Sequence, residues 1–333
     1  MTEAERVGQL FMVGAALDGP IDATMNALSA YHVGSVILTH ASDRSVDDIA
    51  AVSRQLQQAA PNTAKLFIAA DQEGGQVQRL EGPGFETVPS AVEQGQIAPQ
   101  PLRADARRWG SQLRAAGVNL DLAPVVDTVP SGAVNPPIGG MSRQFGSDPA
   151  VVATHGTAFA QGLADAGIDA TLKHFPGLGR VTANTDTAAA VVDQVTTRHD
   201  ADLAPFAAGI KAGVDFVMMS TAYYTRIDAR HPAAFSPSIV TGMLRRDLGF
   251  HGVVISDDVG MATQVAAFSP GTRAVDFVAA GGDIVLTVKP AQIPEMTAAV
   301  LARAAVDATF RAQVHAAALR VLIAKQARRM LRP

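Results

Sequence analysis

The chain has 333 residues, of which 48% are hydrophobic and 17% are charged, and its formal net charge is −4. This is the balance of a folded globular protein, and the lack of a basic excess argues against a nucleic-acid partner. There is no cysteine, which excludes disulfides, thiolate nucleophiles, zinc–thiolate sites and a lipid-modified cysteine. The N-terminal segment has the pattern of neither a signal peptide nor a membrane span. We therefore expect a cytoplasmic protein without a membrane span, with a secreted or lipid-anchored form that has lost its export signal as the alternative.

Short apolar runs alternate along the chain with longer segments of helical character. The runs are almost continuously hydrophobic, as in strands that are buried on both faces of a parallel sheet. In chain order, the expected strands are 8–15, 34–39, 66–70, 118–126, 169–174, 215–220, 252–256 and 283–287. The expected helices are 21–31, 45–60, 101–116, 149–166, 201–212, 236–248, 272–280 and 291–305, followed by a terminal amphipathic helix over 307–331.

The repeat of about eight strand–helix units predicts an α/β fold, a single (β/α)₈ TIM barrel over residues 1–333 with an extra C-terminal helix. An open doubly wound sheet is the alternative. Gly117, Gly167, Gly213 and Gly281 each stand between an expected helix and the next strand. Glycine tolerates the left-handed conformation that ends many helices, so these positions predict helix-to-strand turns. No Pro/Ser-rich linker or change of composition marks a second domain.

Polar residues close several of the expected strands, at Asp71, Asp127, Lys173, His174, Asp257 and Asp258. In a barrel, the C-terminal ends of the strands and the loops that follow them carry the active site. One such residue alone is as well explained by capping or ion pairing. Several on one rim are not, because buried ionisable groups cost several kcal/mol unless they pair or take part in chemistry.

Neither a nucleotide nor a metal is indicated. Gly177-Leu-Gly179 follows an expected strand, but Thr182 stands where the dinucleotide fingerprint needs a third glycine. No histidine pair has the spacing of a zinc protease, and the carboxylates do not follow a calcium-loop pattern. We expect no cofactor and no metal.

At these motifs the sequence resembles glycoside hydrolase family 3, in particular its single-domain bacterial β-N-acetylglucosaminidases. The likeness is carried by segments 8–14, 71–80, 122–127, 143–146, 173–179, 235–250 and 256–261. Lys173-His-Phe-Pro-Gly177 and Ser256-Asp-Asp258 are together the most specific of them. The resemblance implies a retaining enzyme on a TIM barrel that releases terminal β-linked N-acetylglucosamine from muropeptide or chitin fragments.

The resemblance also assigns roles. Asp257 corresponds to the nucleophile that forms the glycosyl-enzyme intermediate. Asp258 is its rival, but neighbouring residues on an extended strand point to opposite faces, so only one of the two can enter the pocket. The sugar-holding positions of the family correspond to Asp71, Arg79, Arg143, Lys173 and His174. We expect Arg143 and Lys173 to lower the pKa of Asp257, and Asp71 to accept hydrogen bonds from two sugar hydroxyls.

The sequence departs from the family at the acid/base. Leu178 replaces a histidine, and Asn184-Thr185-Asp186 stands in place of the family's Asp-Ser-His, whose last residue is the acid/base. Three interpretations follow. Asp186 is itself the acid/base with a raised pKa; or Asp186 and Asn184 only cap the loop and turnover is slow; or the chain binds sugar without hydrolysis. Another β-glycosidase, a phosphorylase and a dinucleotide-dependent barrel are the remaining alternatives.

Overall fold

A computed structural model describes residues 1–60 and 64–331. Eight parallel strands form one sheet in the order β12-β9-β7-β6-β3-β2-β1-β13. Their bounds are β1 Phe11–Ala16, β2 Ser35–Thr39, β3 Phe67–Ala70, β6 Leu120–Asp121, β7 Asp169–Phe175, β9 Phe216–Met219, β12 Val253–Ser256 and β13 Val285–Thr287. A parallel bridge between Ile255 and Ile284 joins the two end strands and closes the barrel. The predicted (β/α)₈ barrel is confirmed, and the open sheet is wrong.

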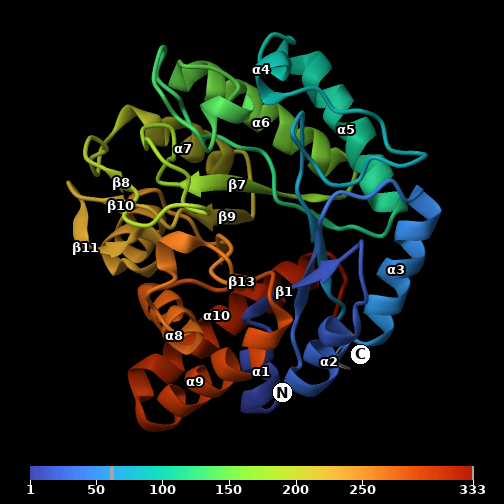
Figure 1. Ribbon diagram of the computed structural model, residues 1–333, viewed down its shortest axis with the longest axis vertical. Coiled ribbons are helices and arrows are strands. Elements are labelled where there is room, and N and C mark those ends of the chain that lie inside the picture. The colour runs from blue at the N-terminus through green and yellow to red at the C-terminus, as the bar shows by residue number, and fades with distance from the viewer. Residues whose placement is uncertain (61–63, 332–333) are drawn as a thin grey trace.

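Helices surround this barrel (Figure 1). Their bounds are α1 Glu3–Gly8, α2 Asp22–Tyr31, α3 Val46–Gln58, α4 Ala91–Gln94, α5 Pro99–Ala115, α6 Pro149–Asp165, α7 Ala204–Lys211, α8 Pro270–Ala280, α9 Ile293–Val306 and α10 Ala308–Ala327. The expected helix over 236–248 is a π-helix, Ser238–Asp247. The four glycines predicted to make helix-to-strand turns all have positive φ, between 80° and 109°.

The strands are buried on both faces, which explains their unbroken hydrophobicity. Along β3, Phe67 and Ala69 join a core cluster with residues of other strands such as Leu120, while Ile68 and Ala70 join a second, larger cluster. Successive side chains of a strand point to opposite faces, so the smaller cluster fills the barrel and the larger one lies between the barrel and its helices.

One expected strand is much shorter than predicted. Only Leu120–Asp121 of the run 118–126 forms β6, although Val125 still bridges Lys173 of β7. Pro124 interrupts the ladder because it has no N–H to donate. The run keeps its place beside β7 and delivers Asp127 to the same end of the barrel.

The N-terminal end of the barrel is closed by α10, the predicted extra helix. Its Val321 packs into the barrel core, and Lys325 reaches inward so that its Nζ lies 2.7 Å from Gln9 Oε1 and 2.8 Å from Gly34 O. The opposite end carries the long loops, with a two-stranded sheet of β4 Gln72–Gly74 and β5 Val77–Gln78 and a three-stranded sheet of β8 Val192–Asp193, β10 Tyr223–Tyr224 and β11 Asp228–Pro232.

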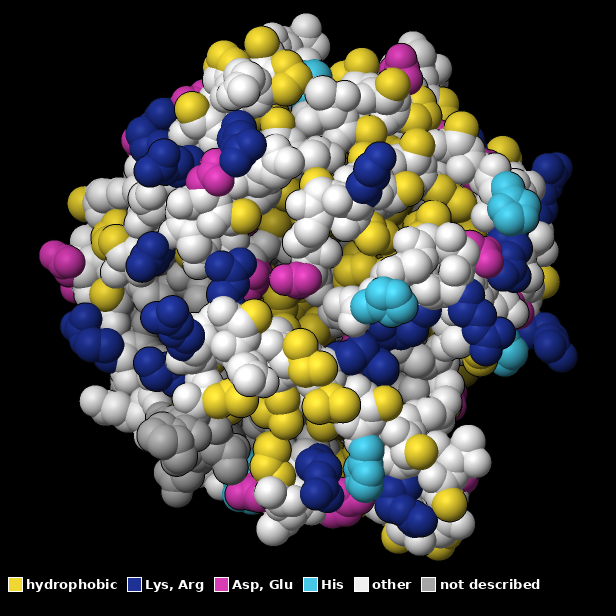
Figure 2. All heavy atoms as spheres, turned by 180° about the vertical axis from the view of Figure 1, so that it is seen from behind, with side chains coloured by type: hydrophobic (Ala, Val, Ile, Leu, Met, Phe, Trp, Pro, Cys, Tyr) yellow, Lys and Arg dark blue, Asp and Glu magenta, His cyan; other side chains and the backbone are white. Residues whose placement is uncertain are grey.

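The surface shows no field of one charge sign on the face seen in Figure 2. Basic and acidic side chains are interspersed there, and hydrophobic side chains gather near its middle. None of the helices within residues 1–60 and 64–331 combines the length and the hydropathy of a membrane-crossing segment.

Candidate active site

A cavity of about 570 Å³ opens at the C-terminal end of the barrel. Its walls include all seven residues assigned by the sequence, namely Asp71, Arg79, Arg143, Lys173, His174, Asp186 and Asp257. Its apolar floor is made by side chains that also belong to the barrel core, namely Ile37, Leu122, Met218 and Leu286. The cavity therefore combines an apolar base with a ring of ionisable groups from different strands.

One wall is a buried network of alternating charges. Lys173 Nζ lies 2.6 Å from Asp71 Oδ1 and 2.7 Å from Glu73 Oε1. Arg143 holds both oxygens of Glu73, at 2.6 and 2.8 Å. Burial alone would raise the pKa of Glu73, but the two cations lower it to about 2. Burial opposes protonation of Lys173, yet Asp71 and Glu73 raise its pKa. Each charge of this wall therefore has a partner of opposite sign within the wall.

The expected effect of these two cations on the pKa of Asp257 stays a prediction. Arg143 and Lys173 are paired with Glu73 and Asp71, and no ion pair joins either of them to Asp257 within the described ranges. No role was predicted for Glu73, although it stands two residues after Asp71, the spacing that puts two strand side chains on one face.

His174 is fixed by Asp127. Its Nδ1 lies 2.8 Å from Asp127 Oδ2, and the other oxygen of Asp127 accepts the N–H groups of His174, at 3.0 Å, and Leu178, at 2.8 Å. The Lys173–His174 peptide bond is cis, and both side chains line the cavity. With Nδ1 engaged by a carboxylate, His174 presents Nε2 to a ligand.

The two neighbouring carboxylates that follow β12 differ in their surroundings. Asp258 accepts N–H bonds from Gly260, Met261 and Val288 at 2.9–3.2 Å. Burial raises its pKa to about 6, against the effect of these bonds. Asp257 accepts a bond only from the N–H of Asp258, at 2.8 Å, within the part of the chain that the structure describes. Asp258 is therefore a brace between two loops, and Asp257 is the carboxylate available to a ligand.

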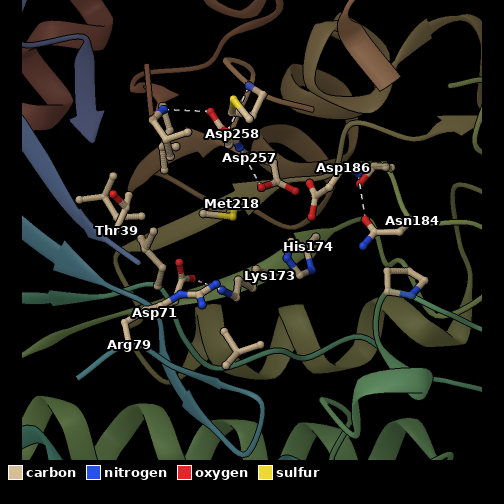
Figure 3. Close-up of a pocket in the computed structure, with 18 of the residues that line it drawn as sticks. Thr39, Asp71, Arg79, Lys173, His174, Asn184, Asp186, Met218, Asp257 and Asp258 are labelled. Atoms are coloured by element: carbon tan, nitrogen blue, oxygen red, sulfur yellow. Dashed lines mark hydrogen bonds and ion pairs between the residues drawn. The ribbon is translucent and has the colours of Figure 1, made fainter. Parts of the chain in front are cut away.

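Asp186 faces Asp257 across the cavity (Figure 3). Asp186 is exposed, and its side chain makes no hydrogen bond with any described residue, whereas Asn184 Oδ1 accepts the N–H of Asp186 at 2.9 Å. Protein atoms crowding its carboxyl raise its pKa, and the negative charge of Asp257 raises it further. Asn184 thus caps this turn, and the carboxyl of Asp186 stays available to a ligand.

Arg79 has a guanidinium that forms no ion pair or hydrogen bond with the described chain, although it lines the cavity near Asp71 (Figure 3). A fork of free donors in a polar pocket is suited to hydroxyl or carbonyl oxygens of a ligand. Within the two described ranges, no group of three or more His, Asp or Glu side chains is arranged to hold a metal ion.

Gly179, in the loop that follows β7, is required by backbone packing. A Cβ at this position would lie 1.7 Å from the carbonyl oxygen of Thr128. The glycine therefore lets two backbone segments pass at close range.

Comparison with known proteins extends over nearly the whole chain. Residues 2–324 match the glycosyl hydrolase family 3 N-terminal domain. A β-hexosaminidase of Xanthomonas oryzae pv. oryzae is 39% identical over 279 residues, 81% of each protein. The crystal structure of a β-N-acetylhexosaminidase from Beutenbergia cavernae has a TM-score of 0.96 and 51% identity, covering 98% of this chain and 99% of that one. A glycoside hydrolase family 3 β-N-acetylglucosaminidase from Paenibacillus has a TM-score of 0.90 and 31% identity, covering 99% of this chain and 63% of its own.

Proposed function

Because the chain belongs to glycoside hydrolase family 3, and is thereby a glycoside hydrolase, we propose that it is a retaining exo-β-N-acetylglucosaminidase. Its substrates are muropeptide or chitin fragments that end in β-linked N-acetylglucosamine. The β-hexosaminidase names of its relatives support this substrate. The observation that carries the proposal is an unpaired carboxylate, Asp257, facing a second carboxyl, Asp186, whose pKa is raised.

In the first step, Asp257 attacks the anomeric carbon of the terminal sugar and forms an ester with it. Asp186 donates its proton to the departing glycosidic oxygen, so the leaving group departs as a neutral alcohol. A carboxyl with a raised pKa keeps its proton to a higher pH than an ordinary carboxyl does, which is what the role of proton donor requires.

In the second step, the ionised Asp186 takes a proton from a water molecule, and this water attacks the anomeric carbon and displaces Asp257. The sugar leaves with its original β configuration, and both carboxyls return to their starting protonation states.

The charged wall holds the sugar. Asp71 is fixed by Lys173, so its carboxylate is placed to accept bonds from two adjacent hydroxyls. Arg79 supplies free donors, and His174 supplies Nε2. Arg143 acts through Glu73, whose two oxygens it holds, and it also lines the cavity. We propose that residues 1–333 form a single catalytic barrel of the family's N-terminal type.

The test is a panel of 4-nitrophenyl glycosides with wild type and Asp257→Asn. We expect wild type to cleave the N-acetyl-β-glucosaminide far faster than the β-glucoside and to release the β-anomer first, by NMR. Asp257→Asn should cleave neither. Preference for the β-glucoside would overturn the substrate, and binding of N-acetylglucosamine by calorimetry without turnover would show a sugar-binding protein. Turnover that needs phosphate and yields a sugar phosphate would show a phosphorylase.

A further inference from the structure

The position of the Asp186 carboxyl depends on its backbone. The side chain makes no hydrogen bond with any residue in the described ranges, so its place beside Asp257 depends on where the main chain holds it. That main chain is held from outside its own loop. The carbonyl oxygen of Asp186 accepts two bonds from Thr263, from the N–H at 3.2 Å and from Oγ1 at 2.8 Å.

Gln264 holds the same segment at two further points. Its N–H donates to the carbonyl of Thr185 at 3.1 Å. Its buried side chain is paired with Val191, accepting the N–H at 2.8 Å and donating to the carbonyl at 3.2 Å. A primary amide offers one acceptor and donors like those of a peptide group, so Gln264 binds Val191 as a neighbouring strand would.

Thr263 and Gln264 lie in the segment that follows Asp257 and precedes α8. The short turn Thr263–Val265 thus lies a few residues after Asp257 in the chain, and it is hydrogen-bonded to the segment that carries Asp186. Asp186 and Asp257 are 71 residues apart in sequence, and these contacts are what ties their loops together directly.

We propose that Thr263 and Gln264 are positioning residues, which set the Asp186 carboxyl against Asp257 and so fix the geometry of proton transfer. This inference rests on the proposed function of Asp186. A brace with a merely structural role would affect all substrates alike. A positioning role affects only the step that needs the proton, because displacement of a catalytic group by about 1 Å is enough to reduce its rate contribution by up to about 100-fold.

The experiment compares kcat/KM for two substrates, which reports the first chemical step for each. The leaving sugar of N,N′-diacetylchitobiose needs a proton, whereas the 2,4-dinitrophenolate of an aryl N-acetyl-β-glucosaminide does not. For Gln264→Ala we expect a loss of about 10-fold or more with the disaccharide and less than about 3-fold with the aryl glycoside. An equal loss with both substrates, or no loss with either, would overturn the inference.

Gln57→Ala is the matched control. The side-chain amide of Gln57 also makes two hydrogen bonds with one backbone residue: it donates to the carbonyl of Leu66 and accepts its N–H, both at 3.0 Å. This pair of bonds lies at the other end of the barrel. Gln57→Ala should lower the melting temperature like Gln264→Ala and leave the ratio of the two kcat/KM values unchanged. A similar change of ratio in Gln57→Ala would show that lost stability, and not position, is responsible.

Thr263 provides a second test that does not remove a buried group. Thr263→Val keeps the shape but loses the hydroxyl, whereas Thr263→Ser keeps the hydroxyl. We expect a smaller, disaccharide-specific loss for Thr263→Val and recovery in Thr263→Ser. If Gln264→Ala does not fold, this pair decides the matter, and equal behaviour of the two variants would overturn the inference.

A double variant separates this inference from the proposed function. In an Asp186→Asn background, Gln264→Ala should cause no further loss with the disaccharide, since there is no acid left to position. A further loss of the same size would overturn the positioning role. If instead Asp186→Asn alone fails to distinguish the two substrates, the acid/base assignment itself is wrong.

Discussion

At the N-terminal end of the barrel, Asp283 is fully buried just before β13, and both of its oxygens are occupied. Arg245 and Arg320 donate to it at 2.6 and 2.7 Å, and the N–H of Val254 donates at 2.8 Å. At the C-terminal end, Asp257 follows β12, and within the described chain it has neither an ion pair nor any donor except the next N–H. Asp283 thus has hydrogen-bond donors on both carboxylate oxygens, whereas Asp257 keeps most of its capacity to accept hydrogen bonds.

The two buried lysines make the same comparison. Lys173, at the C-terminal end, lies between two carboxylates, which raise its pKa. Lys325, at the N-terminal end, contacts the oxygens of Gln9 and Gly34 and the ring of Phe67 but no carboxylate in the described chain, and burial lowers its pKa to about 7. Burial of a charged residue is therefore no sign of function. The informative feature is a charge that is left unpaired while facing a cavity, and this holds for Asp257, Asp186 and Arg79.

The largest effect is expected at the free carboxylate. Asp257→Asn should lower kcat/KM by about 10⁴-fold or more even for a 2,4-dinitrophenyl glycoside, because no glycosyl-enzyme ester is able to form. The free energy of unfolding should change by less than about 0.5 kcal/mol, since the amide oxygen keeps the single bond from Asp258 N–H. Steady-state kinetics and urea unfolding measure the two quantities.

Asp258→Asn is the control for this position. It disturbs three N–H bonds and should destabilise the fold by about 1–3 kcal/mol. If Asp258→Asn were inactive on the aryl glycoside and Asp257→Asn active, the two roles would be exchanged.

The next effect is expected at Asp186. Asp186→Asn should lower kcat/KM for N,N′-diacetylchitobiose by roughly 10²- to 10³-fold, and much less for the aryl glycoside. If Asp186 is the proton donor, we expect the wild-type rate with the disaccharide to fall as pH rises through its raised pKa, because the donor is lost. This basic limb should be missing from the variant. Azide should restore turnover of the aryl substrate with glycosyl azide as the product, and a variant that keeps the basic limb would exclude Asp186 as the acid.

The sequence predicts the barrel well and the site in part, for different physical reasons. Strands are local: an apolar run such as 252–256 and a glycine turn such as Gly281 are visible in consecutive residues. The rim position of Asp71, Lys173 and Asp257 follows from the strand ends. The partners of these residues do not follow, because the pairing of Glu73 with Arg143, 70 residues later, depends on how two loops fold over the barrel. The contact of Gln264 with Val191 spans 73 residues, and no local sequence pattern in either segment predicts it.

A saturated aspartate should behave in the opposite way to Asp257. Asp283→Asn leaves Arg245 and Arg320 with a neutral partner in a buried site, so we expect a loss of about 3 kcal/mol in the free energy of unfolding. The kcat/KM of the folded enzyme should stay the same for both substrates. Urea unfolding and kinetics at a temperature where the variant is folded measure this. If Asp283→Asn were as stable as wild type but changed the ratio of kcat/KM for the two substrates, the distinction between Asp283 and Asp257 would be wrong.

The smallest effect is expected at Lys325, as a dependence of stability on pH. The unfolded lysine has its ordinary pKa of 10.5 and the folded one about 7, so between these values the unfolded chain holds a proton that the folded chain lacks. Stability that depends on Lys325 therefore rises with pH across this window and is constant below it. Relative to Lys325→Met, wild type should gain about 1 kcal/mol per pH unit between pH 7 and 9, measured by urea unfolding.

Val321→Ala is the control for this last measurement, because Val321 lies on the same helix, is equally buried in the barrel core and does not titrate. It should cost on the order of 2 kcal/mol at every pH. At pH 7, Lys325→Met combines relief of a buried charge with loss of the donor to Gln9 and Gly34, so the slope with pH and not the value at one pH is decisive. The difference in the free energy of unfolding between wild type and Lys325→Met could prove as independent of pH as that for Val321→Ala. The buried amine would then keep its proton, and the contrast between Lys325 and Lys173 would fail, while the contrast between the two aspartates would stand.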